Sequence, residues 1–169
     1  METTELSRNT LSFLGLAAEY CGALETALQM DKEEFTALML RLLPRLYITM
    51  SDVEPQPALE EAEPLASYLE PEQYDSIRDG VARLMGEDDT FLETFEEDMK
   101  YSDTPIAATI SESLADIYQP LLDCALAVRD TGAELADQAV AECRESFAEY
   151  WAQTLCNVLR ALNALHYKQ

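Results

Sequence analysis

Positive charge is scarce in this sequence. Its 169 residues include 33 Asp and Glu against 11 Lys and Arg, which gives a formal net charge of −22. A nucleic-acid site needs a basic stripe, and an anionic membrane attracts clustered Lys or Arg. We therefore expect no direct binding to nucleic acid and none to a membrane. A basic protein or a cation is the electrostatically suited partner, although solubility alone also explains such a surface.

Histidine is nearly absent, and cysteine does not occur in metal-binding pairs. The single histidine, His166, stands near the C-terminal end of the sequence, where we expect fraying, so a hydrolytic triad is not expected. The sequence has no CxxC pair and none of the glycine-rich phosphate loops, HExxH or EF-hand patterns. We expect the cysteines to be buried free thiols in a reducing cytoplasm. They are Cys21, Cys124, Cys143 and Cys156.

Long apolar runs are also missing. No run approaches the ~18 residues of a membrane span, and the N-terminal residues lack the basic segment of a secretory signal. Hydrophobic residues make up 48% of the chain, which is ordinary for a globular protein. We expect one cytoplasmic domain over residues 1–169, because a chain of this length buries enough surface to fold without a metal or a disulfide.

Apolar residues recur every three to four positions, and no segment shows a convincing strand alternation. This pattern predicts an all-α fold, a bundle of five to six helices with one long C-terminal helix. Residues 51–66 hold three prolines and four glutamates and are expected to form a solvated connector. The expected helices cover residues 4–28, 32–50, 71–85, a short stretch within 87–100, a helix from Thr104-Pro105, and the C-terminal helix from Thr131.

Residues that favour helix ends mark several of these boundaries. Asp31 and Thr131 are each followed three residues later by a glutamate, which is the spacing of a capping box. Pro71 suits the first turn of a helix, and Gly86 suits the position that follows the last turn. These four residues therefore predict where three of the helices begin and where one ends.

The helix expected after Thr104-Pro105 is apolar on two sides. Its main stripe includes Ile110 and Leu121, and Pro120 in its interior is expected to kink it. A helix with two apolar faces lies at the centre of a bundle or at a subunit interface. A homodimer through the second face is therefore one expectation. The second face consists of Ala115, Tyr118, Leu122 and Leu126.

Carboxylates are the only groups with metal-binding chemistry that the sequence gathers. Helical bundles build divalent-metal sites from Glu and Asp on facing helices, and Mg²⁺ or Mn²⁺ held there can act on phosphates. The alternative is that these carboxylates form a solvated face, because helical spacing turns Glu112 and Asp116 away from the main apolar stripe. The candidate metal ligands are Glu97, Asp98, Asp103, Glu112 and Asp116.

The segment Glu112-Ser-Leu-Ala-Asp116-Ile-Tyr resembles the acidic motif of the all-α nucleotide pyrophosphohydrolases of the MazG type. Those enzymes carry an ExxE motif and then an ExxD motif, whereas Ser113 stands where a ligand is needed here. The resemblance implies a divalent-metal-dependent phosphohydrolase, and the departure at Ser113 leaves the ligand set incomplete.

A larger part of the chain resembles a family of bacterial all-helical proteins catalogued as a domain of unknown function. The likeness covers nearly the whole chain and thins between residues 53 and 64. It implies an all-α fold in a bacterial cytoplasm and implies no activity. Its most specific part is Tyr101-Ser102-Asp103 followed by Glu112 and Asp116. The segments that carry the resemblance are Glu19-Tyr20-Cys21, Leu42 to Tyr47, Phe91 to Tyr118, and Phe147 to Leu165.

Three hypotheses of function follow from these observations. The first is a helical interaction or accessory protein without a cofactor, because catalytic constellations are missing. The second is a divalent-metal phosphohydrolase that uses Glu97, Asp98, Glu112 and Asp116. The third is an acidic mimic of nucleic acid that occupies a basic protein, and it rests on charge alone. The aromatic residues Phe147, Tyr150 and Trp151 are expected to pack in the core or, alternatively, to line a binding groove.

Overall fold

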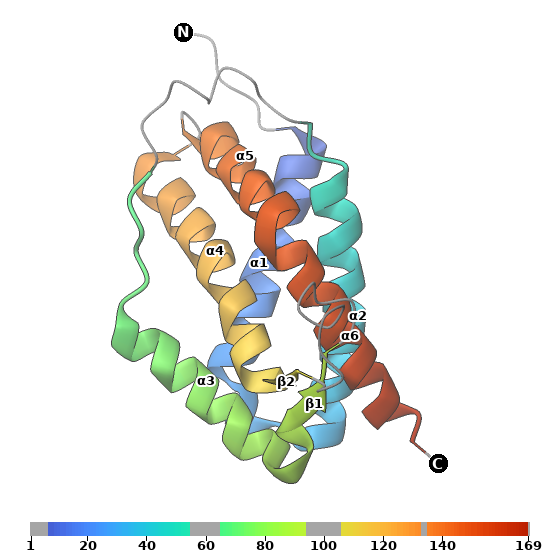
Figure 1. Cartoon of the computed structure of the whole chain (residues 1–169). Helices are drawn as coiled ribbons and strands as arrows, with labels where there is room; N and C mark the ends of the chain where they lie inside the picture. The colour runs from blue at the N-terminus through green and yellow to red at the C-terminus, as the bar shows by residue number, and fades with distance from the viewer. Residues whose placement is uncertain (1–6, 55–64, 94–105, 133–134, 169) are drawn as a thin grey trace, which may run out of the picture.

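Helices dominate the computed structural model, which describes residues 7–54, 65–93, 106–132 and 135–168 (Figure 1). A π-helical turn, η6 (Phe147–Trp151), joins α5 to α6, so that one long helix runs from Ala136 to His166. The expected bundle with a long C-terminal helix is confirmed. The α-helices are α1 (Arg8–Glu25), α2 (Lys32–Ser51), α3 (Pro71–Met85), α4 (Ile110–Thr131), α5 (Ala136–Ser146) and α6 (Ala152–His166). The short elements are the 3-10 turns η1 (Ala27–Gln29) and η3 (Gly86–Asp89) and the strands β1 (Thr90–Leu92) and β2 (Ala107–Thr109).

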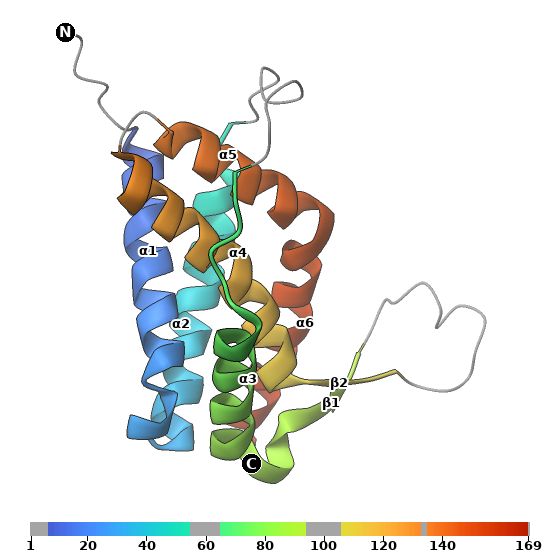
Figure 2. The same ribbon diagram turned by 90° about the vertical axis from the view of Figure 1, so that its left-hand side faces the viewer.

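Helix α4 lies at the centre of the bundle, where it packs against α1, α3, α5 and α6. Its main stripe is buried, and Ala115, Tyr118 and Leu122 of its second apolar face are buried as well. Figure 2 shows α4 running diagonally through the bundle, with the segment that precedes α3 passing over it. The second face is thus covered by helices of the same chain. It gives no support to a homodimer through that surface.

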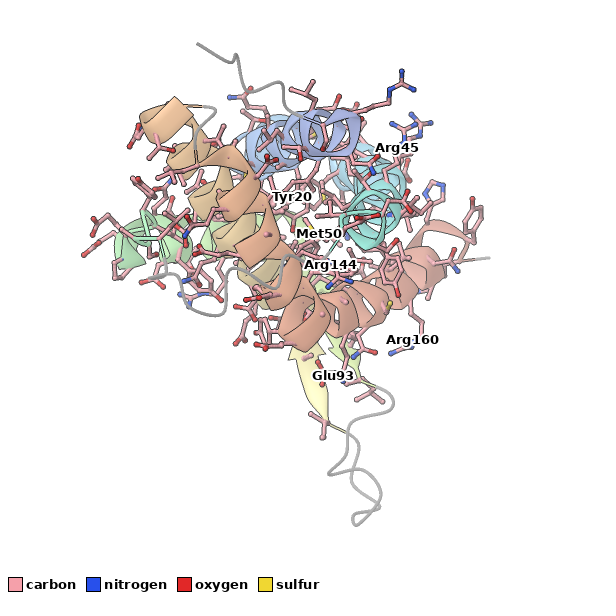
Figure 3. All side chains as sticks on the ribbon, turned by 90° about the horizontal axis from the view of Figure 1, so that it is seen from above. Tyr20, Arg45, Met50, Glu93, Arg144 and Arg160 are labelled. Atoms are coloured by element: carbon pink, nitrogen blue, oxygen red, sulfur yellow. The ribbon has the colours of Figure 1, made fainter. Side chains whose placement is uncertain are left out.

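Tyr20 links α1 to this central helix. Its ring is fully buried, and its hydroxyl donates a hydrogen bond of 2.7 Å to the carbonyl oxygen of Leu114. Figure 3 shows Tyr20 and Met50 pointing into the space that the helices enclose. A buried phenol needs a partner for its hydroxyl group, and the Leu114 carbonyl provides it.

Several predicted helix ends are confirmed. The Asp31 carboxylate accepts a hydrogen bond of 2.8 Å from the amide of Glu34 at the start of α2. Pro71 is the first residue of α3, and Gly86 ends that helix with a φ of 58°. Such a positive φ is nearly free of strain for glycine only. Pro120 does not end α4, which continues from it to Thr131.

The expected helix within residues 87–100 is wrong for residues 90–92, which form β1. This strand pairs antiparallel with β2, in the register Thr90 with Thr109. The expected start of a helix at Thr104-Pro105 is wrong too, because residues 107–109 are extended; Thr104 and Pro105 themselves lie outside the described residues. The first helical residue is Ile110, and the Thr109 hydroxyl caps the helix by accepting from the Glu112 amide. Thr90, Phe91 and Thr109 are residue types that favour strands, whereas Ala107 and Ala108 are not.

The capping box expected at Thr131 is also wrong. Thr131 is the last residue of α4, and its hydroxyl donates to the carbonyl of Ala127. Gly132 follows with a φ of 69° and ends the helix there. The next helix, α5, starts at Ala136 instead. The Thr131 hydroxyl thus bonds to the preceding turn of α4 and does not cap a following helix, because Gly132, with its positive φ, ends α4 directly after it.

Asp89 fastens the strands to α4. Its side chain is only 9% exposed, and its two carboxylate oxygens accept from the amide (2.8 Å) and the hydroxyl (2.7 Å) of Ser111. Ser111 stands in the first turn of α4, where backbone amides have no partner within the helix. The carboxylate thus satisfies an otherwise unpaired amide and holds the end of η3 against α4.

The segment before α3, residues 65–69, is held on α4 and α5 by two carboxylates. Asp123 accepts from the amides of Tyr68 (2.7 Å) and Leu69 (3.0 Å), and Glu142 accepts from the amide of Leu65 (3.2 Å). This segment includes the last two residues of the expected solvated connector, so the connector is ordered there. Residues 55–64 of the connector lie outside the described residues.

Three of the four cysteines are buried free thiols, as expected, but Cys156 is exposed on α6, where burial was expected. Burial raises the pKa of the Cys21 thiol to about 12. A hydrogen bond with Cys124 and burial both raise the pKa of Cys143. No helix among the described residues has both the length and the apolar character needed to cross a membrane.

Replacing Asp89 with alanine tests the fastening of the strands. We expect the free energy of unfolding to fall by about 2–3 kcal/mol, because the buried amide and hydroxyl of Ser111 lose their acceptor. Urea unfolding followed by circular dichroism measures it. Asp88→Ala is the matched control, since it removes the same charge from a surface ion pair with Lys32. The control is expected to cost less than about 1 kcal/mol, and equal losses would contradict the role of Asp89.

Thiol labelling tests whether Cys156 is exposed while the other three cysteines are buried. A thiol reacts as its thiolate, which burial disfavours. We therefore expect one thiol to react quickly in the folded protein and all of them to react after unfolding in denaturant. Cys156→Ser should remove the fast reaction, which absorbance from an aromatic disulfide reagent reports. Fast reaction of a second thiol in that variant would show that Cys21, Cys124 or Cys143 is accessible.

Candidate functional site

Asp116 is the one predicted metal ligand that the structure brings together with other polar side chains. The Tyr74 hydroxyl on α3 donates to one carboxylate oxygen at 2.5 Å, and the Tyr150 hydroxyl on η6 donates to the other at 3.0 Å. Glu112 stands one turn before Asp116 on α4 and is exposed. We call these four residues the acidic tyrosine cluster.

The π-helical turn η6 determines how Tyr150 is presented. Its neighbour Trp151 is fully buried, lies 4.6 Å from the ring of Phe147, and donates its indole N–H to the carbonyl of Cys143 at 3.3 Å. Tyr150 itself is 53% exposed. Core packing is thus confirmed for Phe147 and Trp151, while Tyr150 faces the cluster. A π-helical turn within an α-helix occurs often at functional sites.

Both phenols of the cluster are held in their neutral form. Burial raises the pKa of Tyr150 to about 12, with further contributions from the charges of Asp116, Glu112 and Glu93. Burial and the hydrogen bond to Asp116 raise the pKa of Tyr74. Neutral phenols donate protons in hydrogen bonds and do not act as bases. The two carboxylate oxygens of Asp116 each accept one such bond.

The structure does not describe three of the other predicted ligands. Glu97, Asp98 and Asp103 lie outside the described residues, as do Tyr101 and Ser102. Among the residues that the structure describes, no group of three or more His, Cys, Asp or Glu side chains is arranged to hold a metal ion. The metal site therefore stays a prediction.

A second region stands out by what it lacks. No Asp or Glu occurs between Phe35 and Ser51 or between Tyr150 and Gln169, although the chain contains 33 acidic residues. These stretches form nearly all of α2 and the whole of α6, and the two helices pack against each other. Their outer side is the α2–α6 face. We define it by Leu40, Arg41, Pro44, Arg45 and Ile48 of α2, by Cys156, Leu159, Arg160 and Asn163 of α6, and by Tyr167.

A groove of about 440 Å³ runs along this face between the two helices. None of its lining residues is acidic, and Arg160 is the charged one among them. Leu40, Pro44 and Leu159 are half-buried, while Ile48 is 60% and Tyr167 is 70% exposed. Figure 3 shows Arg45 and Arg160 pointing away from the core at the edges of α2 and α6. The face is therefore apolar in its middle and cationic at its edges.

The arginines of the face are not neutralised by salt bridges with carboxylates in the part of the chain that the structure describes. Arg41, Arg45 and Arg160 form no salt bridge with any carboxylate of the described residues, whose ion pairs involve Lys32, Arg78 and Arg129. Arg160 donates a hydrogen bond to the carbonyl of Leu92, which fixes its direction without cancelling its charge. The two stretches without Asp or Glu can be found in the sequence, but the net charge of −22 does not reveal them, because it sums over the whole chain.

Comparison with known proteins agrees with the fold and adds no activity. Residues 4–168 match a family described as a domain of unknown function, DUF5063. The chain belongs to this family. A solved structure of protein BF1032 from Bacteroides fragilis, a structural-genomics target, shares 29% sequence identity and superimposes with a TM-score of 0.82 over 96% of this chain and 95% of that one. No curated protein matches the sequence.

Asp116→Asn tests the acidic tyrosine cluster of this DUF5063 chain. Loss of the negative charge should lower the pKa of Tyr150 from about 12 toward the ordinary value of 10.0, without reaching it, because burial is the larger cause. Wild-type stability should fall as the pH rises from 10.0 toward 12, since the unfolded phenol ionises first. The variant should lose stability over a narrower pH range, because the folded and unfolded pKa values of Tyr150 lie closer together. Tyrosinate absorbance and urea unfolding measure the two effects.

The control for this prediction is Glu149→Gln, which removes one negative charge beside Tyr150 in the sequence. Glu149 is exposed and is not among the groups that raise the pKa of Tyr150. We expect no change in the tyrosine titration. The same downward shift in both variants would mean that general surface charge, and not the contact with Asp116, sets the pKa.

Proposed function

We propose that this DUF5063 chain is a non-enzymatic interaction module that binds a partner protein through the α2–α6 face. The observation that carries the proposal is the absence of acidic residues from that face in a chain of net charge −22. A surface that serves solubility alone would be expected to carry its share of the charge. The exposed Ile48 and Tyr167, beside arginines that form no salt bridge with a described carboxylate, match the composition of protein interfaces, which are enriched in aromatic residues and Arg.

The acidic tyrosine cluster supports an enzymatic role less well. Each oxygen of Asp116 accepts a tyrosine hydroxyl, and a carboxylate bonded in this way is largely used for positioning α3 and η6 on α4. No buried polar side-chain atom among the described residues lacks a hydrogen-bond partner, so no orphaned group points to a missing substrate or metal. A divalent-metal phosphohydrolase is retained as the second candidate, because three of the five candidate metal ligands lie outside the described residues.

A cytoplasmic setting is part of the proposal. Its support is chemical: the chain carries four free cysteines, one of them exposed. Free thiols persist in reducing compartments and tend to be oxidised outside the cytoplasm.

Site-specific photo-crosslinking in the native host tests the module. A photoreactive phenylalanine analogue in place of Ile48, on the α2–α6 face, should give a protein adduct of defined mass, because the partner lies against this side chain. Leu28 is the matched control position. It is also an exposed apolar residue, at 51% against 60% for Ile48, but it lies in η1 away from the face. Gel mobility and mass spectrometry identify adducts.

Adding Arg41→Glu to the Ile48 probe should remove the adduct, because the substitution reverses a charge of the face. The folded state of each variant is checked by circular dichroism. Identical adduct patterns from Ile48 and Leu28, or no adduct from Ile48 at any growth stage, would refute a binding role for this face.

A further inference from the structure

We infer that the occupant of the α2–α6 groove is an acidic amphipathic helix of a partner protein. The inference rests on the proposed function and deepens it by naming the chemistry of the partner. The net charge of the chain, −22, would by itself suggest a basic partner. The local composition of the groove points the other way.

The floor of the groove fits apolar side chains. Leu40 and Pro44 come from α2, and Leu159 and Cys156 come from α6. Leu40, Pro44 and Leu159 are half-buried, and Leu40 and Leu159 pack against the hydrophobic core, so these two present fixed apolar surface to the outside. A volume of about 440 Å³ accommodates a few side chains of leucine size. An occupant would insert its apolar residues between the two helices.

The edges of the groove fit carboxylates. Arg160 lines it on the α6 side, and Arg41 follows Leu40 on the outward side of α2, one turn before Arg45. None of the three forms a salt bridge with a described carboxylate. Guanidinium groups bind carboxylates through a planar pair of N–H donors. An occupant with acidic residues on both flanks of an apolar stripe would meet an arginine on each side.

A helix fits this site better than a strand. Strand addition needs a free sheet edge, and the sheet of the described residues has only the two short strands β1 and β2, which are no part of the face. Two packed helices instead leave a groove along their length, into which a third amphipathic helix lays its apolar stripe. The occupant would therefore extend the helical bundle by one helix.

The negative charge of the rest of the molecule does not prevent such a complex. The Debye length at physiological ionic strength is about 8 Å, so exposed charges beyond that distance are largely screened. The charge nearest the contact is then that of Arg160, the one charged residue that lines the groove, and it is positive. Long-range repulsion would slow the encounter of two acidic proteins without abolishing the contact.

A second copy of this chain suits the face less well. A symmetric dimer would place the same patch on both subunits, and Arg41, Arg45 and Arg160 of one subunit would face those of the other. Like charges at an interface are unfavourable. A head-to-tail contact, with this face against an acidic helix of the next copy, would leave the chain open to polymerisation.

Designed peptides supply the probe, because the natural partner is unidentified. The first is a helical peptide with leucines at every third or fourth position and glutamates on both flanks. The second has glutamine in place of each glutamate, and the third has lysine. Fluorescence anisotropy with the full-length protein should show binding of the glutamate peptide, at least about tenfold weaker binding of the glutamine peptide, and no binding of the lysine peptide. Added salt should weaken the first interaction.

Variants of the protein locate the contact. Arg41→Gln and Arg160→Gln should each weaken binding of the glutamate peptide by about two- to fivefold, which is the usual range for exposed ion pairs. Arg83→Gln is the control, since it removes the same charge from an exposed position on α3. Leu159→Asp should abolish binding, and unfolding curves distinguish this from loss of the fold.

Three outcomes would overturn the inference. The first is equal binding of the glutamate and lysine peptides, and the second is equal weakening by Arg83→Gln and Arg41→Gln. The third is a dimer in sedimentation that Leu159→Asp dissolves, since a second copy would then be the occupant. The proposed function fails separately. Crosslinks from Ile48 without peptide binding would leave a module with a partner of other chemistry, whereas peptide binding without crosslinks would leave the groove without a partner in the cell.

Discussion

The burial of two apolar faces of α4 is the constraint on which the rest of the structure depends. A helix that buries both Leu121 on its main stripe and Tyr118 on its second face needs neighbours in several directions. Those neighbours are α1, α3, α5 and α6, and each buries its own apolar stripe in doing so. At about 25 cal/mol per Å² of apolar surface, this burial is the main term that opposes the entropy of the chain. Every other feature is attached to α4 or arranged around it.

The acidic side chains show how α4 also organises the polar contacts. Asp89, Asp116 and Asp123 are buried or half-buried carboxylates, and each joins α4 to another segment. Asp89, at the end of η3, accepts from the first turn of α4. Asp116 and Asp123 belong to α4: Asp116 accepts from α3 and η6, and Asp123 accepts from the segment before α3. Each accepts at least two hydrogen bonds, which offsets the cost of removing a charge from water. Exposed acids such as Glu112 and Glu149 stay in solvent, where mutual repulsion is screened.

Much of the fold could be predicted from the sequence, and the failures have physical causes. The helices that start at Asp31 and Pro71 were predicted closely, because periodicity and end signals agree there. The strands β1 and β2 were missed because three residues are too few to show an alternation. Thr131 has the spacing of an N-cap, but Gly132 directly after it ends the preceding helix. Whether Thr131 ends one helix or caps the next cannot be decided without knowing which helix it belongs to.

The candidate site was harder to predict for a different reason. Asp116 was singled out, but its partners Tyr74 and Tyr150 lie 42 and 34 residues away in the chain, and neither shares a motif with it. Side-chain pairs between distant elements follow from the packing of the helices, which a single sequence does not specify. The α2–α6 face had a simple signal, two long stretches without Asp or Glu. Net charge averages over such stretches, so it concealed them.

The averaging matters for how a strongly acidic protein selects partners. Net charge acts at long range, where salt screens it, and it influences the rate of encounter more than the stability of a contact. Stability depends on groups within a few ångströms of one another. At the groove, Arg160 lies among apolar residues, and no carboxylate is among the residues that line it. The acidic remainder of the surface then favours specificity, because it repels acidic proteins in every orientation except the one that presents the groove. A chain of one dominant sign can in this way confine binding to the one place where that sign is absent.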